Sequence, residues 1–149
     1  MIKGVFVMKI AIASDHGGFK LKQEIVKYLK DNGYDFTDFG TDSSDSVDYP
    51  DYAKPLATKV SAGEFDRGIL ICGTGIGMNI AANKVEGVRC AHVHDVYSAK
   101  LTRQHNDSNV IAMGERVIGP GLAVDIIDTW LKTEFEGGRH ERRVKKIED

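Results

Sequence analysis

The sequence predicts an α/β protein, a three-layer α/β/α sandwich in which helices cover both faces of a five-stranded parallel sheet. Short apolar runs rich in β-branched residues alternate with segments of helical spacing, in the order β-α-β-α-β-α-β-α-β-α-α. Continuous apolar strands that alternate with helices are typical of parallel strands joined by right-handed crossovers, because such strands are buried on both faces. The length of 149 residues fits one domain with a sizeable core.

The first strand and the first helix are predicted at residues 5–14 and 19–32. Residues 5–14 form an apolar, β-branched run that stops at an Asp-His-Gly-Gly turn. Residues 19–32 repeat apolar side chains at close to i, i+4 and i+7 and end in Asn-Gly, a good helix stop. Met8 is a second plausible start, so residues 1–7 are interpreted as an N-terminal extension of a single domain, residues 1–149.

The remaining elements follow from the same two patterns. Apolar runs between turns predict strands at residues 34–39, 67–71, 88–94 and 110–113, and amphipathic segments predict helices at 49–62, from about 78, at 96–104, 119–131 and 139–148. Pro50 suits the first turn of its helix, whereas Pro55 is expected to kink that helix. Residues 40–48 are rich in Ser, Asp and Gly and are expected to form a surface loop. The arrangement is Rossmann-like.

Charge and cysteine content exclude several classes of protein. Twenty Lys and Arg against 22 Asp and Glu give a formal net charge of −2, which disfavours nonspecific nucleic-acid binding. Two cysteines are too few for the disulfide framework of a small secreted domain and fit a reducing compartment. No apolar run reaches the roughly 20 residues of a membrane span, and no signal-peptide cleavage site follows the N-terminus. We therefore expect a cytoplasmic protein that binds neither nucleic acid nor membranes.

Polar segments follow the predicted strands at the edge where a parallel sheet binds its ligands. In such sheets the ligand lies outside the carboxyl ends of the strands. The segments expected there are Asp15-His16, the CGTGIG run at residues 72–77, His94-Asp95 and Gly114-Glu115-Arg116. The end of the helix at 96–104, with His105-Asn106-Asp107, is expected to join them on the same rim.

The glycine-rich turn at residues 72–77 favours a negatively charged partner. Successive backbone N–H groups in a strand-to-helix turn stabilise a phosphate, or an oxyanion formed during a reaction. The turn is not a P-loop, because no Gly-Lys-Ser/Thr follows it, and it fails the dinucleotide pattern because Met78 stands where the third glycine belongs. A plain tight connection between strand and helix remains the alternative.

The two cysteines receive different interpretations. Cys72 opens the glycine-rich turn, where neighbouring amides stabilise a thiolate that can act as a nucleophile or a base. Cys90 lies inside an apolar strand and is interpreted as a small buried hydrophobic residue. Asp15-His16, at the end of the first strand, is either part of the site or a turn that caps the first helix.

Two further clusters leave alternatives open. His92 and His94 project from one face of their strand and, with Asp95, could be ligands of a metal hydrolase, although no second cluster of ligands completes the set. Arg139 and Arg143 lie four residues apart, hence on one helical face, and two guanidiniums suit a phosphate monoester. A solvated basic helix is the alternative for these arginines.

Several segments together resemble the ribose-5-phosphate isomerases of type B and their galactose-6-phosphate isomerase relatives. They are IAIASDHGGFKLK, the Asp-Tyr-Pro-Asp-Tyr run at 48–52, GILICGTGIGMNIAANK, SAKLTRQHNDSNVIAMGERVIG and GGRHERRV, in family order over nearly the whole chain from Met8. The resemblance implies interconversion of ribose 5-phosphate and ribulose 5-phosphate, in the pentose phosphate pathway, without a metal or an organic cofactor.

The resemblance also implies a role for each matched residue. Cys72 matches the catalytic base, and because no carboxylate stands in the loop around Asn79, the chain follows the cysteine branch of the family rather than the glutamate branch. Thr74 and the amides of Gly73, Gly75, Ile76 and Gly77 match the anion hole, and His105 and Asp15 match the residues for ring opening. Asn106 matches a residue that contacts sugar oxygens. The residues that match phosphate-binding positions are His16, Arg116, Arg139 and Arg143.

These residue types suit the implied chemistry. An aldose–ketose isomerisation needs one base that reaches both C1 and C2, and donors that stabilise an enediolate. The resemblance further implies a homodimer or a tetramer in which His105, Asn106 and Arg116 reach the site of the neighbouring subunit. The alternatives are a six-carbon sugar-phosphate isomerase, acting on allose 6-phosphate or galactose 6-phosphate, a noncatalytic sugar-phosphate sensor, and the metal hydrolase.

Overall fold

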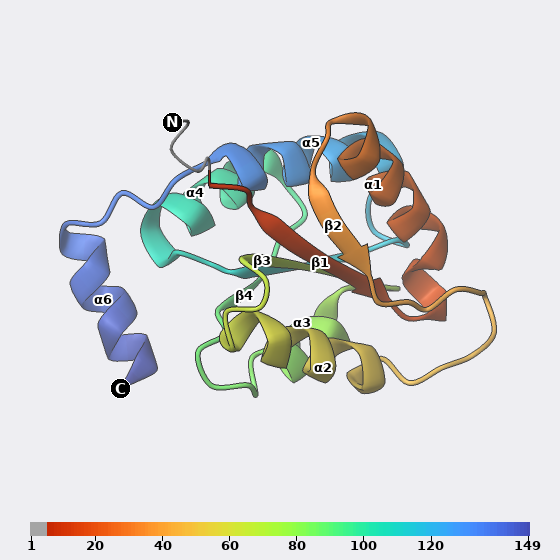
Figure 1. Ribbon diagram of the computed structural model, residues 1–149, viewed down its shortest axis with the longest axis horizontal. Coiled ribbons are helices and arrows are strands. Elements are labelled where there is room, and N and C mark those ends of the chain that lie inside the picture. The colour runs from red at the N-terminus through yellow and green to blue at the C-terminus, as the bar shows by residue number, and fades with distance from the viewer. Residues whose placement is uncertain (1–5) are drawn as a thin grey trace, which may run out of the picture.

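The computed structural model describes residues 6–149 and centres on a five-stranded sheet in the order β2-β1-β3-β5-β4 (Figure 1). The strands are β1 (Lys9–Ser14), β2 (Asp35–Asp38), β3 (Arg67–Cys72), β4 (Cys90–His92) and β5 (Val110–Gly114). Every adjacent pair is parallel, which confirms the predicted sheet. Of the N-terminal extension predicted at residues 1–7, residues 1–5 lie outside the described part of the chain.

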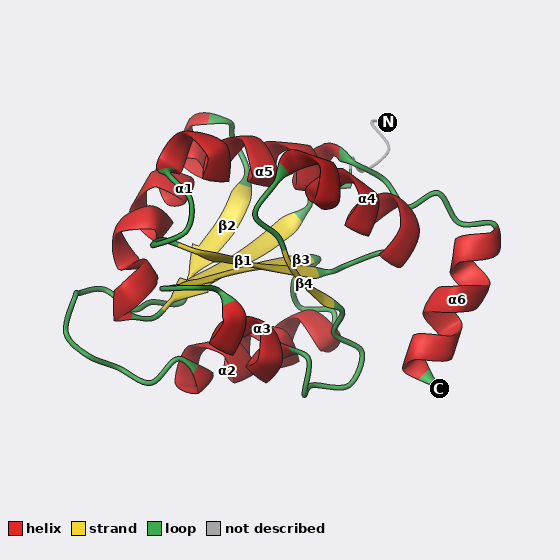
Figure 2. Cartoon of the chain, turned by 180° about the vertical axis from the view of Figure 1, so that it is seen from behind, coloured by secondary structure: helices red, strands yellow, loops and turns green. Residues whose placement is uncertain are grey.

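Helices cover both faces of the sheet (Figure 2). One face packs against α1 (Phe19–Asp31), α4 (Val96–Asn106) and α5 (Pro120–Lys132), and the other against α2 (Pro50–Ser61) and α3 (Ile76–Ala82). A short 3-10 helix, η1 (His16–Gly18), connects β1 to α1, and α6 (Arg139–Glu148) extends away from the layers. The predicted three-layer α/β/α sandwich is confirmed.

Side chains of the central strands alternate between two apolar layers. In β1, Ile10 and Ile12 pack on the side of α1 and α5, whereas Ala11 and Ala13 pack on the side of α2 and α3. Trp130 of α5 is fully buried in the first of these layers. Burial on both faces explains why the strands are continuous apolar runs in the sequence.

Several details differ from the sequence-based expectation, beginning with β1, which starts at Lys9 rather than at residue 5. β4 spans only Cys90–His92 rather than residues 88–94, because it is an edge strand that pairs with β5 alone. The helix α2 runs through Pro55, where Leu56 and Val60 are buried against the sheet and hold the helix in place. Within the described part of the chain, no helix combines the length and apolar character needed to cross a membrane.

Candidate active site

The carboxyl ends of β1 and β3 bring Asp15 and the glycine-rich turn together. The Asp15 amide donates to the Ile71 carbonyl at 3.2 Å, and its buried carboxylate accepts the Gly17 N–H at 2.9 Å. A Cβ placed on Gly17 would lie 3.2 Å from the Gly73 nitrogen. Asp15 therefore caps η1, the turn that leads into α1, and also lies beside the turn that follows Cys72; its part in the site stays a prediction.

Cys72 ends β3 with its side chain almost completely buried, at 5% exposure. The backbone N–H of Gly75 points at its sulfur, with 3.1 Å between nitrogen and Sγ. This contact is compatible with the role of base that the resemblance implies for Cys72. Cys90 is only partly buried, at the border of the apolar layer under α2 and α3, and desolvation raises the pKa of its thiol.

Thr74 is an exposed polar residue of the turn. Its hydroxyl oxygen accepts the Ile76 N–H at 3.2 Å, and its carbonyl oxygen lies 2.8 Å from Nε2 of His92. The hydroxyl thus sits at the start of α3, beside the amides predicted to form the anion hole. Two of these amides, from Gly75 and Ile76, are aimed at the side chains of Cys72 and Thr74.

His92 and His94 contact the backbone of this turn and of the end of β5. Their rings meet edge to face, 4.6 Å between centroids, which confirms that they share one face. Nε2 of His94 accepts the Gly114 N–H at 2.9 Å, and burial together with the neighbouring His92 lowers the pKa of His94. Asp95 caps α4 by accepting the Ser98 N–H. Because Nε2 of each ring contacts backbone, the geometry favours a supporting role over the metal-hydrolase alternative.

Arg116 and His16 complete the rim around the turn. The Arg116 guanidinium lies 3.6 Å from the position of a Cβ on Gly73 of the same chain. In this chain Arg116 therefore lies beside its own glycine-rich turn, and the expectation that it reaches a neighbouring subunit stays a prediction. Nδ1 of His16 accepts the Val47 N–H at 3.2 Å, which ties the loop before α2 to this rim.

Tyr49 is a rim residue that sequence reasoning left without a role. Its partly exposed ring lies 2.7 Å from the position of a Cβ on Gly77, so it covers the first turn of α3. A side chain at position 77 would displace this ring. The Asp-Tyr-Pro-Asp-Tyr run was the available signal, because an aromatic residue in a polar loop is unusual.

His105 and Asn106 lie at the opposite edge of the sheet. The helix α4 runs antiparallel to the strands, and its last residue, Asn106, has its carbonyl 3.2 Å from Nε of Arg89, which directly precedes β4. The expectation that His105-Asn106-Asp107 joins the rim of Cys72 is therefore wrong within one chain. A crossover helix begins at the carboxyl edge and must end near the amino edge, where the next strand starts.

A second polar cluster forms around His105. Its ring stacks on that of His140 from α6, 4.2 Å between centroids with planes 13° apart. Arg139 and Arg143 extend from the same helix, and burial, His105 and these arginines lower the pKa of His140. His140 was not singled out from the sequence, because a histidine in a charged segment carries no periodic signal.

This second cluster also contains the described group with metal-ligand spacing. Ligand atoms of His105, Glu136 and His140 lie within 4.8 Å of one another. Arg139 and Arg143 beside them oppose a bound cation and favour an anion such as a phosphate. The predicted site residues thus form two half-sites. One, at the carboxyl edge, holds Asp15, His16, Cys72, residues 73–77 and Arg116; the other holds His105, Asn106, Arg139 and Arg143.

Comparisons with known proteins agree with this geometry. The chain matches the Ribose/Galactose Isomerase family model over residues 10–147. It is 54% identical over 139 residues to ribose-5-phosphate isomerase B of Escherichia coli (strain K12), covering 93% of each chain. The structure resembles Clostridium thermocellum ribose-5-phosphate isomerase B, with a TM-score of 0.93, 58% identity and 95% coverage of each chain. It also resembles the Mycoplasma genitalium ribose-5-phosphate isomerase B with bound ribulose-5-phosphate, at a TM-score of 0.91, 44% identity and coverage of 95% of this chain and 94% of that one. The chain belongs to the ribose/galactose isomerase family.

Proposed function

We propose that this protein interconverts D-ribose 5-phosphate and D-ribulose 5-phosphate through a cis-enediolate, with Cys72 as the base. One observation carries the proposal: a buried thiol at the carboxyl edge of the sheet accepts an N–H from a glycine-rich turn. Family membership and the relative with bound ribulose-5-phosphate support the substrate class. The chemistry needs no metal or organic cofactor, because a proton transfer between adjacent carbons requires only a base and donors to the oxyanion.

The proton moves in two steps. The Cys72 thiolate takes the proton from C2 of the open-chain aldose, and the electron pair forms the C1–C2 double bond while O1 becomes an oxyanion. The thiol then returns the proton to C1 while the O2 proton moves to O1, so that O1 becomes a hydroxyl and C2 becomes the carbonyl carbon. Thr74 and the amides of residues 73–77 stabilise the oxyanion, at about 3 kcal/mol per well-placed donor.

Ring opening precedes these steps, because ribose 5-phosphate is mainly a furanose. The furanose opens when an acid protonates the ring oxygen and a base takes the proton of the anomeric hydroxyl. We assign the acid to His105, whose ring nitrogen can donate a proton, and the base to Asp15. Asn106 contacts sugar oxygens, and His16, Arg116, Arg139 and Arg143 bind the phosphate end.

The two half-sites are too far apart to act on one sugar within a single chain, so we infer that two chains share each site. A homodimer places His105 and Asn106 of one chain beside Cys72 of the other, and two dimers can pair into a tetramer. Exposed apolar side chains at the carboxyl edge support a partner surface there. These are Ile76 and Ile80 on α3 and Val96 and Tyr97 at the start of α4, the last of which is 73% exposed. We place the enzyme in the cytoplasm.

The proposal is tested by following hydrogen exchange with solvent at C2 of ribose 5-phosphate. The wild-type protein should catalyse exchange and turnover, also in the presence of a strong chelator. Cys72→Ala should lose both while keeping its affinity for the sugar phosphate, because the phosphate-binding residues remain. Retained turnover in this variant would refute the role of Cys72. Turnover of six-carbon phosphates under the same conditions decides between the pentose substrate and the allose 6-phosphate or galactose 6-phosphate alternative.

A further inference from the structure

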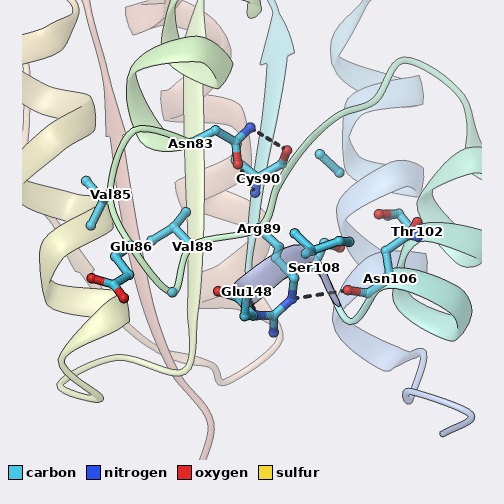
Figure 3. A pocket seen from close by; sticks show the side chains of 13 residues that line it. Asn83, Val85, Glu86, Val88, Arg89, Cys90, Thr102, Asn106, Ser108 and Glu148 are labelled. Atoms are coloured by element: carbon cyan, nitrogen blue, oxygen red, sulfur yellow. Dashed lines mark hydrogen bonds and ion pairs between the residues drawn. The ribbon is translucent and has the colours of Figure 1, made fainter. Parts of the chain in front are cut away.

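Arg89 joins three segments at the amino edge of the sheet. Its Nε donates to the carbonyls of Asn106 and Asp107, at 3.2 and 3.1 Å, and a terminal nitrogen donates again to Asp107 at 2.9 Å. The other terminal nitrogen pairs with the carboxylate of Glu148 in α6. Figure 3 shows this guanidinium between the end of α4 and the end of α6.

These contacts complete the C-terminus of α4. The last carbonyls of a helix have no partner within the helix and carry a partial negative charge. At the end of α4 the chain turns sharply, with Asp107 in the left-handed region at φ 48°. A planar guanidinium can donate to two carbonyls at once, which the single ammonium of lysine cannot do with the same geometry.

Arg103, itself buried in α4, also holds this end, because its Nη1 donates to the Asp107 carboxylate at 2.8 Å and to the Ser108 carbonyl at 2.7 Å. A cavity of about 590 Å³ lies beside the end of α4, and Arg89, Thr102, Asn106 and Ser108 are among the residues that line it (Figure 3). Asn106 is exposed, and His105 is only half-buried. The carbonyls of Asn106 and Asp107 are the groups that Arg89 holds, whereas Arg103 holds the Asp107 carboxylate and the Ser108 carbonyl.

We propose that Arg89 is a positioning residue for ring opening, holding the last turn of α4 so that His105 and Asn106 meet the sugar. This inference rests on the proposed function and assigns no direct contact between Arg89 and the substrate. Through Glu148 the same guanidinium also orients α6, which carries Arg139 and Arg143. Its loss displaces the ring-opening acid while Cys72, at the opposite edge, keeps its environment.

A comparison of ribose 5-phosphate with ribulose 5-phosphate separates ring opening from the proton transfer at Cys72. Ribose 5-phosphate must open its furanose ring before Cys72 can act. Ribulose 5-phosphate is open-chain, because its O5 carries the phosphate and attack by O4 on C2 would close a strained four-membered ring. Exchange of the C1 hydrogen of ribulose 5-phosphate with solvent therefore reports on Cys72 and the oxyanion donors without ring opening.

The experiment compares Arg89→Met and Arg89→Lys with the matched control Arg142→Met, an exposed arginine of α6. For folded Arg89→Met we expect kcat for ribose 5-phosphate to fall about 100-fold, as a displacement of the ring-opening acid by about 1 Å would cause. We also expect a higher KM for both sugar phosphates. Saturated exchange at C1 of ribulose 5-phosphate should stay within about twofold of wild type. Arg89→Lys should show the same split to a smaller extent.

Three results would overturn the inference: no change in kcat, an equal loss in both assays by a folded variant, or the loss of the folded state in both Arg89 variants as judged by circular dichroism. Arg142→Met should match wild type in both assays, and a loss equal to that of Arg89→Met would also count against Arg89. A wild-type protein that catalyses neither reaction would instead overturn the proposed function, so the two failures are distinguishable.

Discussion

Single residues fix the shape of the glycine-rich turn at residues 72–77. Gly75 adopts φ 80°, and a Cβ there would lie 2.8 Å from the Met113 carbonyl carbon. Only glycine fits such a position, where a positive φ coincides with a close backbone approach. This conformation aims the Gly75 N–H at Cys72, so the glycine is a chemical requirement of the site as well as a steric one.

His94 makes stability dependent on pH. Burial and His92 hold its pKa below the usual value of 6.5, because the charged ring is disfavoured in the folded state. At pH values between the lower pKa of the folded state and the pKa of the unfolded state, the unfolded chain binds more protons than the folded chain. The contribution of His94 to the free energy of unfolding is therefore complete above about pH 6.5 and is lost as pH falls through the folded pKa. An imidazolium also cannot accept the Gly114 N–H.

We therefore expect the free energy of unfolding in urea to fall between pH 7.5 and 5.5. His94→Gln keeps an acceptor for Gly114 and does not titrate, so its stability should fall less over the same interval. The pH dependence that remains in this variant includes that of His140, whose pKa is also lowered by burial. Equal slopes in the variant and wild type would show that His94 is not the group responsible.

At the scale of elements, a buried ion pair joins α1, β2 and the loop that follows β2. The Lys22 side chain is 1% exposed, and its ammonium donates to both carboxylate oxygens of Asp38, at 2.7 and 2.9 Å, and to the Thr41 carbonyl at 2.6 Å. This loop continues to Val47 and Tyr49, which contact the rim of the candidate site. The ion pair thus anchors one wall of that site.

Lys22→Met should lower the free energy of unfolding by about 2 kcal/mol. Removing one partner of a fully buried pair costs about 3–5 kcal/mol, and the 31% exposure of Asp38 reduces that cost through solvation. Lys59→Met, which removes an exposed lysine 3.5 Å from Glu64, is the matched control and should change stability by less than about 1 kcal/mol. Urea denaturation measures both, and indistinguishable effects would contradict the anchoring role.

At the scale of the whole molecule, the two half-sites predict complementation between inactive chains. Cys72→Ala and His105→Ala should each abolish turnover of ribose 5-phosphate alone. When the two are unfolded together and refolded, about half of the dimers are mixed, and each mixed dimer has one intact site of two, so activity should reach about a quarter of wild type. Absence of recovery in verified mixed dimers would show that the site is not shared.

The sequence by itself determined the α/β sandwich and the half-site that contains Cys72. Continuous apolar strands dictate parallel pairing, and Asp15, Cys72 and the glycine-rich turn directly follow strands, so their place at the carboxyl edge is a local consequence of chain order. The continuation of α2 through Pro55 and the true length of β4 were less predictable, because tertiary burial and edge position overrode local preference.

The tertiary structure decided where the remaining residues lie. It moved His105 and Asn106 to the opposite edge, kept Arg116 on its own rim, and revealed His140 and Arg89 as their neighbours. These contacts join residues far apart in the sequence, and they depend on the length and direction of α4 and on how α6 docks. Local patterns encode which face of an element is buried, whereas the meeting of distant elements is set by the packing of the whole chain.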